Sequence, residues 1–327
     1  MTNSSSERPG EFELIAKLFA PLSAKAAGAY GLTDDAATFQ PPPGEELVVT
    51  ADLLTAGIHF RPEDPAALIA KKALRVNLSD LAAKGAVPVG YLLSLALPRG
   101  WTPSWMQSFA DGLRDDQDAF SVALFGGDTT HTTGPLTIAI TAFGTLPSGT
   151  MTRRNGAKIG DSIFVSGTIG DAGAGLAVLN GELANVAVDD REALTSRYLV
   201  PTPRLALGKA LRGVATASLD VSDGLLADLG HIAETSKIRI AVDAGRVPLS
   251  DAWKKAGTSL SSAVTAGDDY EIAFTAPSAR RDEVLQLARH AGTVVTEIGR
   301  VEVGSGVALL DSSGQEIPVS RKGYRHF

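Results

Sequence analysis

The hydrophobic pattern of the chain alternates between helix-like and strand-like segments. The spacing of Phe12, Ile15, Leu18 and Phe19 predicts one amphipathic helix over 11–19. Further helical patterns cover 66–84, 103–118 and 205–210. Apolar runs bounded by turn residues predict strands over 47–50, 91–97, 122–125, 136–143, 162–166, 218–221, 238–242, 271–275 and 293–301. This mixture predicts an α+β fold.

A break in this pattern divides the chain into two halves. At about 150 residues per domain, 327 residues are enough for two domains with separate cores. Turn residues at 145–149 follow a completed strand, and a similar order of elements begins after them. We therefore predict domains at 1–148 and 149–327, each a mixed β-sheet packed with helices.

Composition narrows the possible functions. The 37 acidic and 30 basic residues give a net charge of −7, which argues against a nucleic-acid partner. The absence of cysteine excludes disulfides, thiolate metal sites and thiol nucleophiles, so any metal is expected to prefer oxygen ligands. The first residues lack the pattern of a signal peptide, and no apolar stretch approaches 18 residues. We predict a soluble, cytoplasmic protein without a membrane partner.

Six segments place acidic residues at the ends of apolar runs, with few basic residues nearby. They are 31–36, 48–52, 77–80, 124–129, 219–224 and 266–271. A turn or helix-cap role explains any one of them. If the carboxylates converge, each close pair repels by about 4 kcal/mol and needs a cation, for which Mg²⁺ is the natural choice. The sequence leaves their convergence open.

Other acidic residues lie on charged helix faces. For these we predict a solvated surface position, and they are Asp111, Asp115, Asp116, Asp118, Asp189 and Asp190.

Four other features have both a structural and a functional interpretation. The glycine-rich turn at 165–175 is either a phosphate cradle or a tight strand-to-helix turn. In the segment 125–129, paired glycines let a ligand approach the backbone while Asp128 offers a metal ligand. His59 is either a structural residue or a substrate contact. Arg153 and Arg154 form either a surface turn or a phosphate clamp.

Several motifs, in order along nearly the whole chain, resemble those of the thiamine-monophosphate kinase family. They are GLTDDAA, VTADLLTAGIHF, KALRVNLSDLAAKGAVP, GGDTT, RNGAKIGD, SGTIGDAGAGL, LDVSDGLLADLGHI, GDDYEI and KGYRHF. The resemblance implies two domains of the aminoimidazole-ribotide synthetase-like type. It also implies ATP-dependent phosphorylation of thiamine monophosphate to thiamine diphosphate, several Mg²⁺ ions, and a homodimer formed through the N-terminal domains.

The resemblance also assigns roles to individual positions. The implied metal ligands are Asp35, with Asp34 as the adjacent alternative, Thr50, Ala51 through its backbone, Asp52, Asp80, Asp128, Asp220 and Asp223. The implied ATP contacts are Gly127, Arg154 and Ser222, and the implied substrate contacts are His59, Asp268 and Tyr324. Relatives commonly have glutamate where this chain has Asp268, so the reach of that contact is shorter here.

The implied reaction needs no covalent nucleophile. A phosphate acceptor with a second pKa of about 6 is already largely dianionic at neutral pH, so direct in-line transfer is expected, without a phosphoenzyme. Two alternatives stay open: an amidine-forming ligase acting on a purine precursor, and a non-catalytic scaffold that binds divalent metal. Selenophosphate synthetases and hydrogenase-maturation dehydratases of this superfamily depend on cysteine or selenocysteine chemistry, which disfavours them here.

Overall fold

The structure is a computed structural model that describes residues 9–319, 323 and 324. Most of the polar N-terminal tail and part of the motif at 322–327 lie outside the described residues. The chain divides into two compact units. Unit 1 comprises residues 1–81 and 87–147, and unit 2 comprises 82–86 and 148–327. The predicted domain limits, 1–148 and 149–327, stay a prediction.

Unit 1 is a four-stranded sheet with helices. Its elements, with η marking 3₁₀- and π-helical segments, are α1 (Glu11–Leu14), η1 (Ile15–Phe19), η2 (Ala20–Ser23), η3 (Ala27–Leu32), β1 (Glu45–Thr55), α2 (Ala66–Lys84), β2 (Val87–Pro98), α3 (Pro103–Phe120), β3 (Ala123–Thr132) and β4 (Thr137–Pro147). The strand order is β1-β4-β2-β3; β2 and β3 are parallel and the other pairs are antiparallel.

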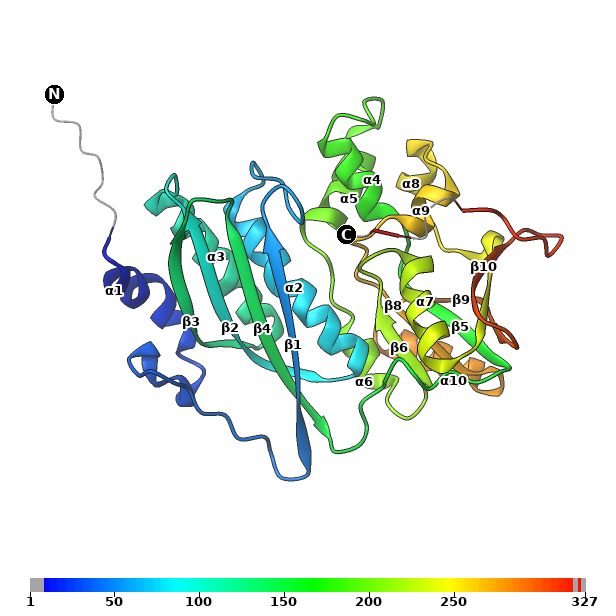
Figure 1. Cartoon of the computed structure of the whole chain (residues 1–327), viewed down its shortest axis with the longest axis horizontal. Coiled ribbons are helices and arrows are strands. Elements are labelled where there is room, and N and C mark those ends of the chain that lie inside the picture. The colour runs from blue at the N-terminus through cyan, green and yellow to red at the C-terminus, as the bar shows by residue number, and fades with distance from the viewer. Residues whose placement is uncertain (1–8, 320–322, 325–327) are drawn as a thin grey trace. The chain divides into compact units, whose positions relative to one another are not determined.

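The long helices α2 and α3 cover one face of this sheet (Figure 1). On that face, alternate residues of β2 are buried, namely Tyr91, Leu93 and Leu95. Apolar side chains of the helices are buried as well, among them Leu74 on α2 and Phe109 on α3. The buried residues recur at every second position on the strand and about every 3.6 positions on the helices. Together they form the core of unit 1.

The first predicted helix is only partly correct. Residues 11–19 are helical, but four α-helical residues give way to a π-helix at Ile15. Leu18 and Phe19 are buried as expected, whereas Phe12 is 85% exposed. The wider π-helical turn rotates later side chains relative to earlier ones, so one apolar stripe cannot continue across both.

Unit 2 is a six-stranded sheet with helices on both faces. Its elements are β5 (Asp161–Ser166), α4 (Asp171–Leu179), α5 (Val188–Leu199), α6 (Leu205–Ala210), β6 (Ala217–Asp220), α7 (Leu225–Ser236), β7 (Arg239–Asp243), η4 (Ala244–Arg246), α8 (Asp251–Ala256), α9 (Leu260–Thr265), β8 (Ile272–Pro277), η5 (Ser278–Arg280), α10 (Arg281–His290), β9 (Val295–Glu302) and β10 (Gly306–Leu310).

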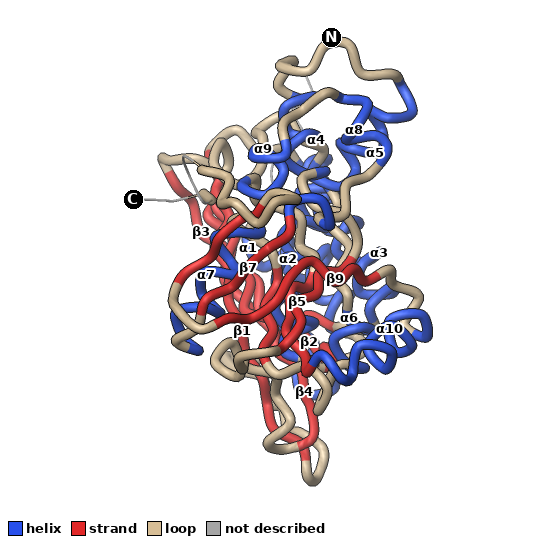
Figure 2. Tube along the Cα trace, turned by 90° about the vertical axis from the view of Figure 1, so that its right-hand side faces the viewer, coloured by secondary structure: helices blue, strands red, loops and turns tan. Residues whose placement is uncertain are grey.

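The strand order in unit 2 is β10-β7-β9-β5-β8-β6. Figure 2 shows β7, β9 and β5 side by side. Ile163 and Val165 of β5 belong to a buried cluster with α7, and Phe164 between them belongs to a second cluster with α6 and α10. β5 therefore presents apolar side chains to both faces of the sheet, which explains its continuous apolar run in the sequence.

The surface prediction for one acidic residue is wrong. Asp116 on α3 is 1% exposed, and its two carboxylate oxygens accept hydrogen bonds from Nε and a terminal nitrogen of Arg75, at 2.7 and 2.8 Å. Arg75 lies on α2, 41 residues earlier, so local charge patterning could not reveal the pair. No helix in the described part of the chain combines the length and hydropathy needed to cross a membrane.

Candidate active site

Strand β1 separates two sets of side chains by strict alternation. Leu47, Val49, Ala51 and Leu53 are exposed on one face, whereas Val48 and Leu54 are buried on the other. Thr50 and Asp52 fall in the second set and point to the helix-covered face. The side chain of Ala51, another member of the implied metal set, faces away from Thr50 and Asp52, so only its backbone could serve as a metal ligand there.

Thr50, Asp52 and Asp80 form one group on this face. The Thr50 hydroxyl donates a hydrogen bond of 2.5 Å to Oδ2 of Asp80, which joins β1 to α2. Burial, together with the negative charge of Asp80, raises the pKa of Asp52 to about 7. Within the described residues, neither carboxylate forms an ion pair. Two facing acids without a basic partner favour a cation between them.

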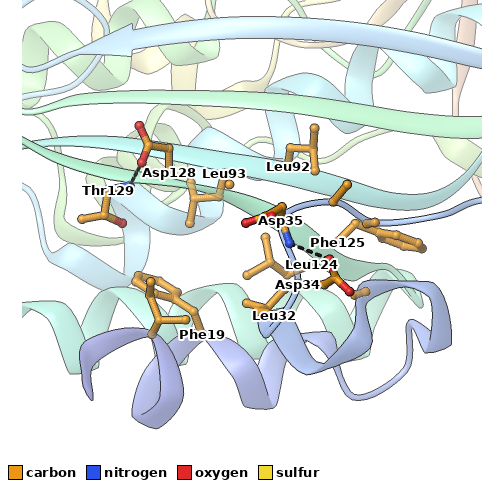
Figure 3. A pocket seen from close by; sticks show the side chains of 16 residues that line it. Phe19, Leu32, Asp34, Asp35, Leu92, Leu93, Leu124, Phe125, Asp128 and Thr129 are labelled. Atoms are coloured by element: carbon orange, nitrogen blue, oxygen red, sulfur yellow. Dashed lines mark hydrogen bonds between the residues drawn. The ribbon is translucent and has the colours of Figure 1, made fainter. Parts of the chain in front are cut away.

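A second group surrounds a cavity of about 480 Å³ in unit 1. Asp34 and Asp35, in the loop after η3, lie on one side, and Asp128 on β3 lies on another (Figure 3). Gly127 lines the same cavity. The three acids are exposed, and Asp128 accepts a hydrogen bond from the backbone of Thr129. The structure thus brings Asp35, Gly127 and Asp128 to one cavity.

The backbone at Gly127 requires glycine. The pairing of β2 with β3 shifts by one residue at Phe125, a β-bulge that re-aims the following residues. Gly127 has φ of +156°, and a Cβ there would lie 1.7 Å from the carbonyl oxygen of Leu93. The paired glycines therefore let β3 lie against β2 while Asp128 is presented to the cavity.

His59 lies in a tight turn at the end of β1. Its Nδ1 accepts a hydrogen bond of 3.0 Å from the backbone N–H of Thr55. The turn is closed by a bridge between Ala56 and Phe60 and by a hydrogen bond from the backbone of Gly57 to that of Phe60. Because Nδ1 is the acceptor, a neutral ring carries its proton on Nε2, which is then a donor.

In unit 2, two loops bring four of the predicted residues together. The segment after β6 continues to pair with the segment before β8, since the Asp268 backbone donates to Ser222 and the Tyr270 backbone donates to Val221. The Tyr324 backbone donates to Asp223 at 3.0 Å. Ser222, Asp223, Asp268 and Tyr324 therefore lie in one place, next to the buried Asp220 at the end of β6.

Asp228, which the sequence analysis missed, holds the turn that carries Ser222 and Asp223. Its Oδ2 accepts hydrogen bonds from the backbones of Ser222, Asp223 and Gly224 at 3.0 to 3.1 Å. Burial, with the charge of Asp223 added, raises the pKa of Asp228 to about 7. Ligand atoms of Asp223, Asp228 and His231 lie within 4.8 Å of one another. Its position five residues after Asp223, in the first turn of a helix, was the available signal.

Two buried acids of the segment 266–271, whose structural role was not predicted, fix the loop of Asp268. Asp269 accepts hydrogen bonds from the backbones of Gly170 and Ala172 at the start of α4, and burial raises its pKa to about 8. These contacts make the glycine-rich turn at 165–175 a packed strand-to-helix turn, because a carboxylate of the protein already occupies its N–H groups.

Glu271 is paired with two arginines. Its oxygens accept hydrogen bonds from Arg204 at 2.5 and 2.7 Å, from Arg197 at 2.6 Å and from the Ser166 hydroxyl at 2.6 Å. Burial alone would raise the pKa of Glu271, but the two guanidinium groups lower it below its usual value. Asp268, just before these anchors, and Tyr270, between them, adopt φ of +70° and +49°, and the Tyr270 hydroxyl donates to Asp268.

Arg154 stands apart from the other predicted residues of unit 2. Its carbonyl accepts hydrogen bonds from the hydroxyls of Thr235 and Ser236, at the end of α7. Ser222 precedes the start of that 12-residue helix, which is about 18 Å long. The described contacts therefore do not bring Arg154 and Ser222 together.

The comparisons with known proteins match both units. Residues 33–146 match the family model "AIR synthase related protein, N-terminal domain", and residues 158–312 match the model for the C-terminal domain. A thiamine-monophosphate kinase of Caulobacter vibrioides is 42% identical over 97% of this chain and 91% of its own length. The chain belongs to the thiamine-monophosphate kinase family.

Solved structures of the thiamine-monophosphate kinase family have the same fold. The enzyme from Stenotrophomonas maltophilia K279a superposes with a TM-score of 0.81 and 42% identity, over 91% of this chain and 97% of that one. The structure of AaThiL complexed with AMPPCP and TMP gives 0.78 and 32% identity, over 99% and 100%. The predicted fold of two synthetase-like domains with mixed sheets is confirmed.

Proposed function

We propose that this member of the thiamine-monophosphate kinase family transfers the γ-phosphoryl group of ATP to thiamine monophosphate, giving thiamine diphosphate and ADP. The observation that carries the proposal is the pair Asp52 and Asp80, two facing carboxylates without a basic partner among the described residues. Identity to relatives along nearly the whole chain supports the same reaction. The relative AaThiL has been solved in complex with AMPPCP and TMP. AMPPCP is an ATP analogue, and TMP is the abbreviation of thiamine monophosphate, the proposed acceptor.

The predicted metal ligands suit Mg²⁺. All are carboxylate, hydroxyl or backbone oxygens, the hard donors that this ion prefers. In unit 1 they are Asp35, Thr50, Ala51, Asp52, Asp80 and Asp128, and in unit 2 they are Asp220 and Asp223. Bound Mg²⁺ would neutralise phosphate charge and lower the repulsion between the two substrates. The high pKa of Asp52 fits this assignment, because a cation restores the charged form of a carboxylate that burial disfavours.

The side chains of the protein bind and orient the substrates. Gly127, Ser222 and Arg154 are the proposed ATP contacts, and His59, Asp268 and Tyr324 are the proposed contacts of thiamine monophosphate. Asp268 is shorter than the glutamate common in relatives, but Asp269 and Glu271, which follow it closely in the chain, fix the loop on its C-terminal side. That fixed loop compensates for reach by holding the carboxylate in one orientation.

The chemical step exchanges one P–O bond for another. A phosphate oxygen of thiamine monophosphate attacks the γ-phosphorus, a new P–O–P linkage forms, and the bond from the γ-phosphorus to the β,γ-bridging oxygen breaks to release ADP. The acceptor phosphate is mostly dianionic above a pKa of about 6, so no general base removes a proton. Catalysis consists of alignment and charge neutralisation, and no residue is covalently phosphorylated.

Phosphorus NMR of the protein with ATP, Mg²⁺ and thiamine monophosphate tests the proposal. We expect signals of thiamine diphosphate and ADP to grow at equal rates. ATP turnover with the formylglycinamidine ribotide instead of thiamine monophosphate would establish the ligase alternative. Metal-dependent stability without turnover of ATP would establish the scaffold. Labelled phosphate retained on denatured protein would contradict direct transfer.

We also propose a homodimer formed through unit 1. The outer face of its sheet exposes Leu47, Val49 and Leu53 by 45%, 56% and 59%, and Leu92 on β2 is 39% exposed. A contiguous row of apolar side chains on one sheet face is typical of an interface, and a second copy would cover it. Light scattering should show a dimer for the native chain and a monomer for Leu53→Lys; a monomeric native chain would contradict this. The cytoplasmic location stays a prediction.

A further inference from the structure

A second cavity of unit 1 has no role in the assignments above. It has a volume of about 460 Å³ and lies where β1 and β2 end and α2 and α3 begin. Its walls include Ala56, Phe60, Ile69, Leu97, Trp101 and Trp105. No lining residue is charged, and the hydroxyl of Thr102 already caps α3 by accepting from the backbone of Trp105. Such a lining suits an aromatic or apolar group and does not suit a phosphate.

Three aromatic side chains line this cavity. Two of the three tryptophans of the chain, Trp101 and Trp105, line it together with Phe60. Trp105 is held in place by stacking on Phe109, with ring centroids 5.3 Å apart and planes inclined by 17°. Tryptophan faces stack on flat rings and attract cationic ones. The chemistry of the cavity therefore favours a planar aromatic ligand, including a positively charged heterocycle.

The cavity also lies at a definite distance from the acid pair of unit 1. From Asp52 to Ala56, β1 advances by about 13 Å. From Ile69 to Asp80, α2 covers about 16 Å in the opposite direction, because Asp80 bonds to Thr50 at one end while Ile69 lines the cavity with Ala56 at the other. Along either element, the distance from the carboxylates to the cavity thus matches the length of an extended phosphate monoester that carries two aromatic rings.

The turn that carries His59 lies between the acid pair of unit 1 and this cavity. Ala56 and Phe60, which bracket the turn through their bridge, both line the cavity. His59 between them is a proposed substrate contact. A ligand that reaches from the carboxylates past His59 therefore arrives at the tryptophans.

We infer that this cavity binds the aromatic end of the phosphoryl acceptor, its aminopyrimidine and thiazolium rings, while the phosphate lies towards Asp52 and Asp80. This inference rests on the proposed function for the identity of the acceptor. It makes Trp101, Trp105 and Phe60 the determinants of acceptor specificity in unit 1. Stacking of one ring on an aromatic side chain changes affinity by about ten- to a hundredfold, which sets the expected size of the effect.

Steady-state kinetics of three variants test the inference. Trp101→Ala should raise the KM for thiamine monophosphate at least about tenfold, with the KM for ATP unchanged, and Trp101→Phe should recover most of the loss. Ala56→Phe, which fills the cavity without removing a packed side chain, should raise the same KM. Ile58→Ala is the matched control, since Ile58 lies in the same turn, is 58% exposed and does not line the cavity.

Binding of thiamine, which has the rings but no phosphate, separates this inference from the proposed function. Calorimetry with millimolar thiamine should detect binding to the native protein and much weaker binding to Trp101→Ala and Ala56→Phe. Turnover of thiamine monophosphate with an unchanged acceptor KM in both variants would overturn the inference and leave the function standing. A native protein that neither phosphorylates thiamine monophosphate nor binds thiamine would overturn both. Thiamine binding without turnover would keep the cavity and remove the kinase.

Discussion

The acids of the two units differ in what surrounds them. In unit 1, Asp52 and Asp80 face each other, and the described residues supply no basic partner, so the pKa of Asp52 rises to about 7. In unit 2, Glu271 is more deeply buried than Asp52, but Arg197 and Arg204 lower its pKa. A buried carboxylate that the fold itself neutralises serves the structure. One that the fold leaves with a like charge is arranged for a cation from outside.

The largest expected effect comes from removing a charge of the unit 1 pair. Asp80→Asn keeps the size of the side chain and an oxygen for the Thr50 hydroxyl, but loses the ligand charge. We expect the turnover number to fall about a thousandfold, as for loss of other transition-state charge stabilisation. The metal-free protein should be as stable as before or more so, because Asp80 repels Asp52. Coupled assays of ADP release and thermal unfolding in EDTA measure the two quantities.

The control for that variant is Asp111→Asn on α3. Asp111 is about half exposed and pairs with Arg114 on the surface. Its replacement should leave the rate unchanged. A rate for Asp80→Asn within a factor of two of the native rate would remove Asp80 from the metal site.

Replacing Glu271, the arginine-paired acid of unit 2, should lower the stability of the protein, whereas replacing Asp80 should not. Glu271→Gln leaves Arg197 and Arg204 mostly buried without their common partner, which should lower the free energy of unfolding by about 3 kcal/mol. Urea titration followed by circular dichroism measures this loss. Glu283→Gln, which removes an exposed pair with Arg280, should change stability little. Equal losses in both variants would contradict the distinction between the two kinds of acid.

Asp269 supplies a pH test of the same comparison. Its folded pKa of about 8 lies above the usual value of 3.8, so the folded state holds a proton that the unfolded state has lost. Stability from this group is therefore greatest at low pH and declines as the pH rises from about 4 to about 8. Between pH 5 and pH 7, the native protein should lose roughly 3 kcal/mol relative to Asp269→Asn, whose amide does not titrate. If the free energies of unfolding of the two proteins in EDTA change with pH in parallel, this prediction is contradicted.

The smallest effect is the stabilisation by metal. Each tenfold excess of Mg²⁺ over its dissociation constant should add about 1.4 kcal/mol to the free energy of unfolding of the native protein. The gain should be reduced in Asp52→Asn and should persist in Glu271→Gln after allowance for its lower starting stability. Calorimetric melting at increasing Mg²⁺ measures it, and a native melting temperature that ignores Mg²⁺ would speak against the site.

Local sequence signals predicted much of the fold. The helices at 66–84 and 205–210 begin and end where their patterns do, because apolar spacing and flanking turns mark both ends. The predicted strands are present, but β10 (Gly306–Leu310) was missed and β1 was drawn short. β1 extends to Thr55, beyond the predicted 47–50, since its inner face carries Thr50 and Asp52 in place of apolar residues. A polar site within a strand hides that strand from a search for hydrophobic runs.

The candidate site was less accessible from the sequence. The acids of each segment were visible, but Asp269 caps a helix almost a hundred residues away, and Arg204 precedes its partner Glu271 by 67 residues. Only the folded chain reveals such pairs, as it does the burial of Asp116 by Arg75. The cavity at Trp101 and Trp105 is equally non-local, because four separate segments contribute to its walls: 56–62, Ile69, 97–105 and 135–136.

The alternation along β1 limits how this strand can change in length. Its odd-numbered positions, Leu47 to Leu53, form the outer apolar face, and its even-numbered positions include Thr50 and Asp52. One inserted or deleted residue would exchange the two sets, turning a leucine towards Asp80 and a carboxylate towards the outer face. Two inserted residues would restore the alternation. Among functional relatives, we therefore expect insertions and deletions within this strand to occur in pairs.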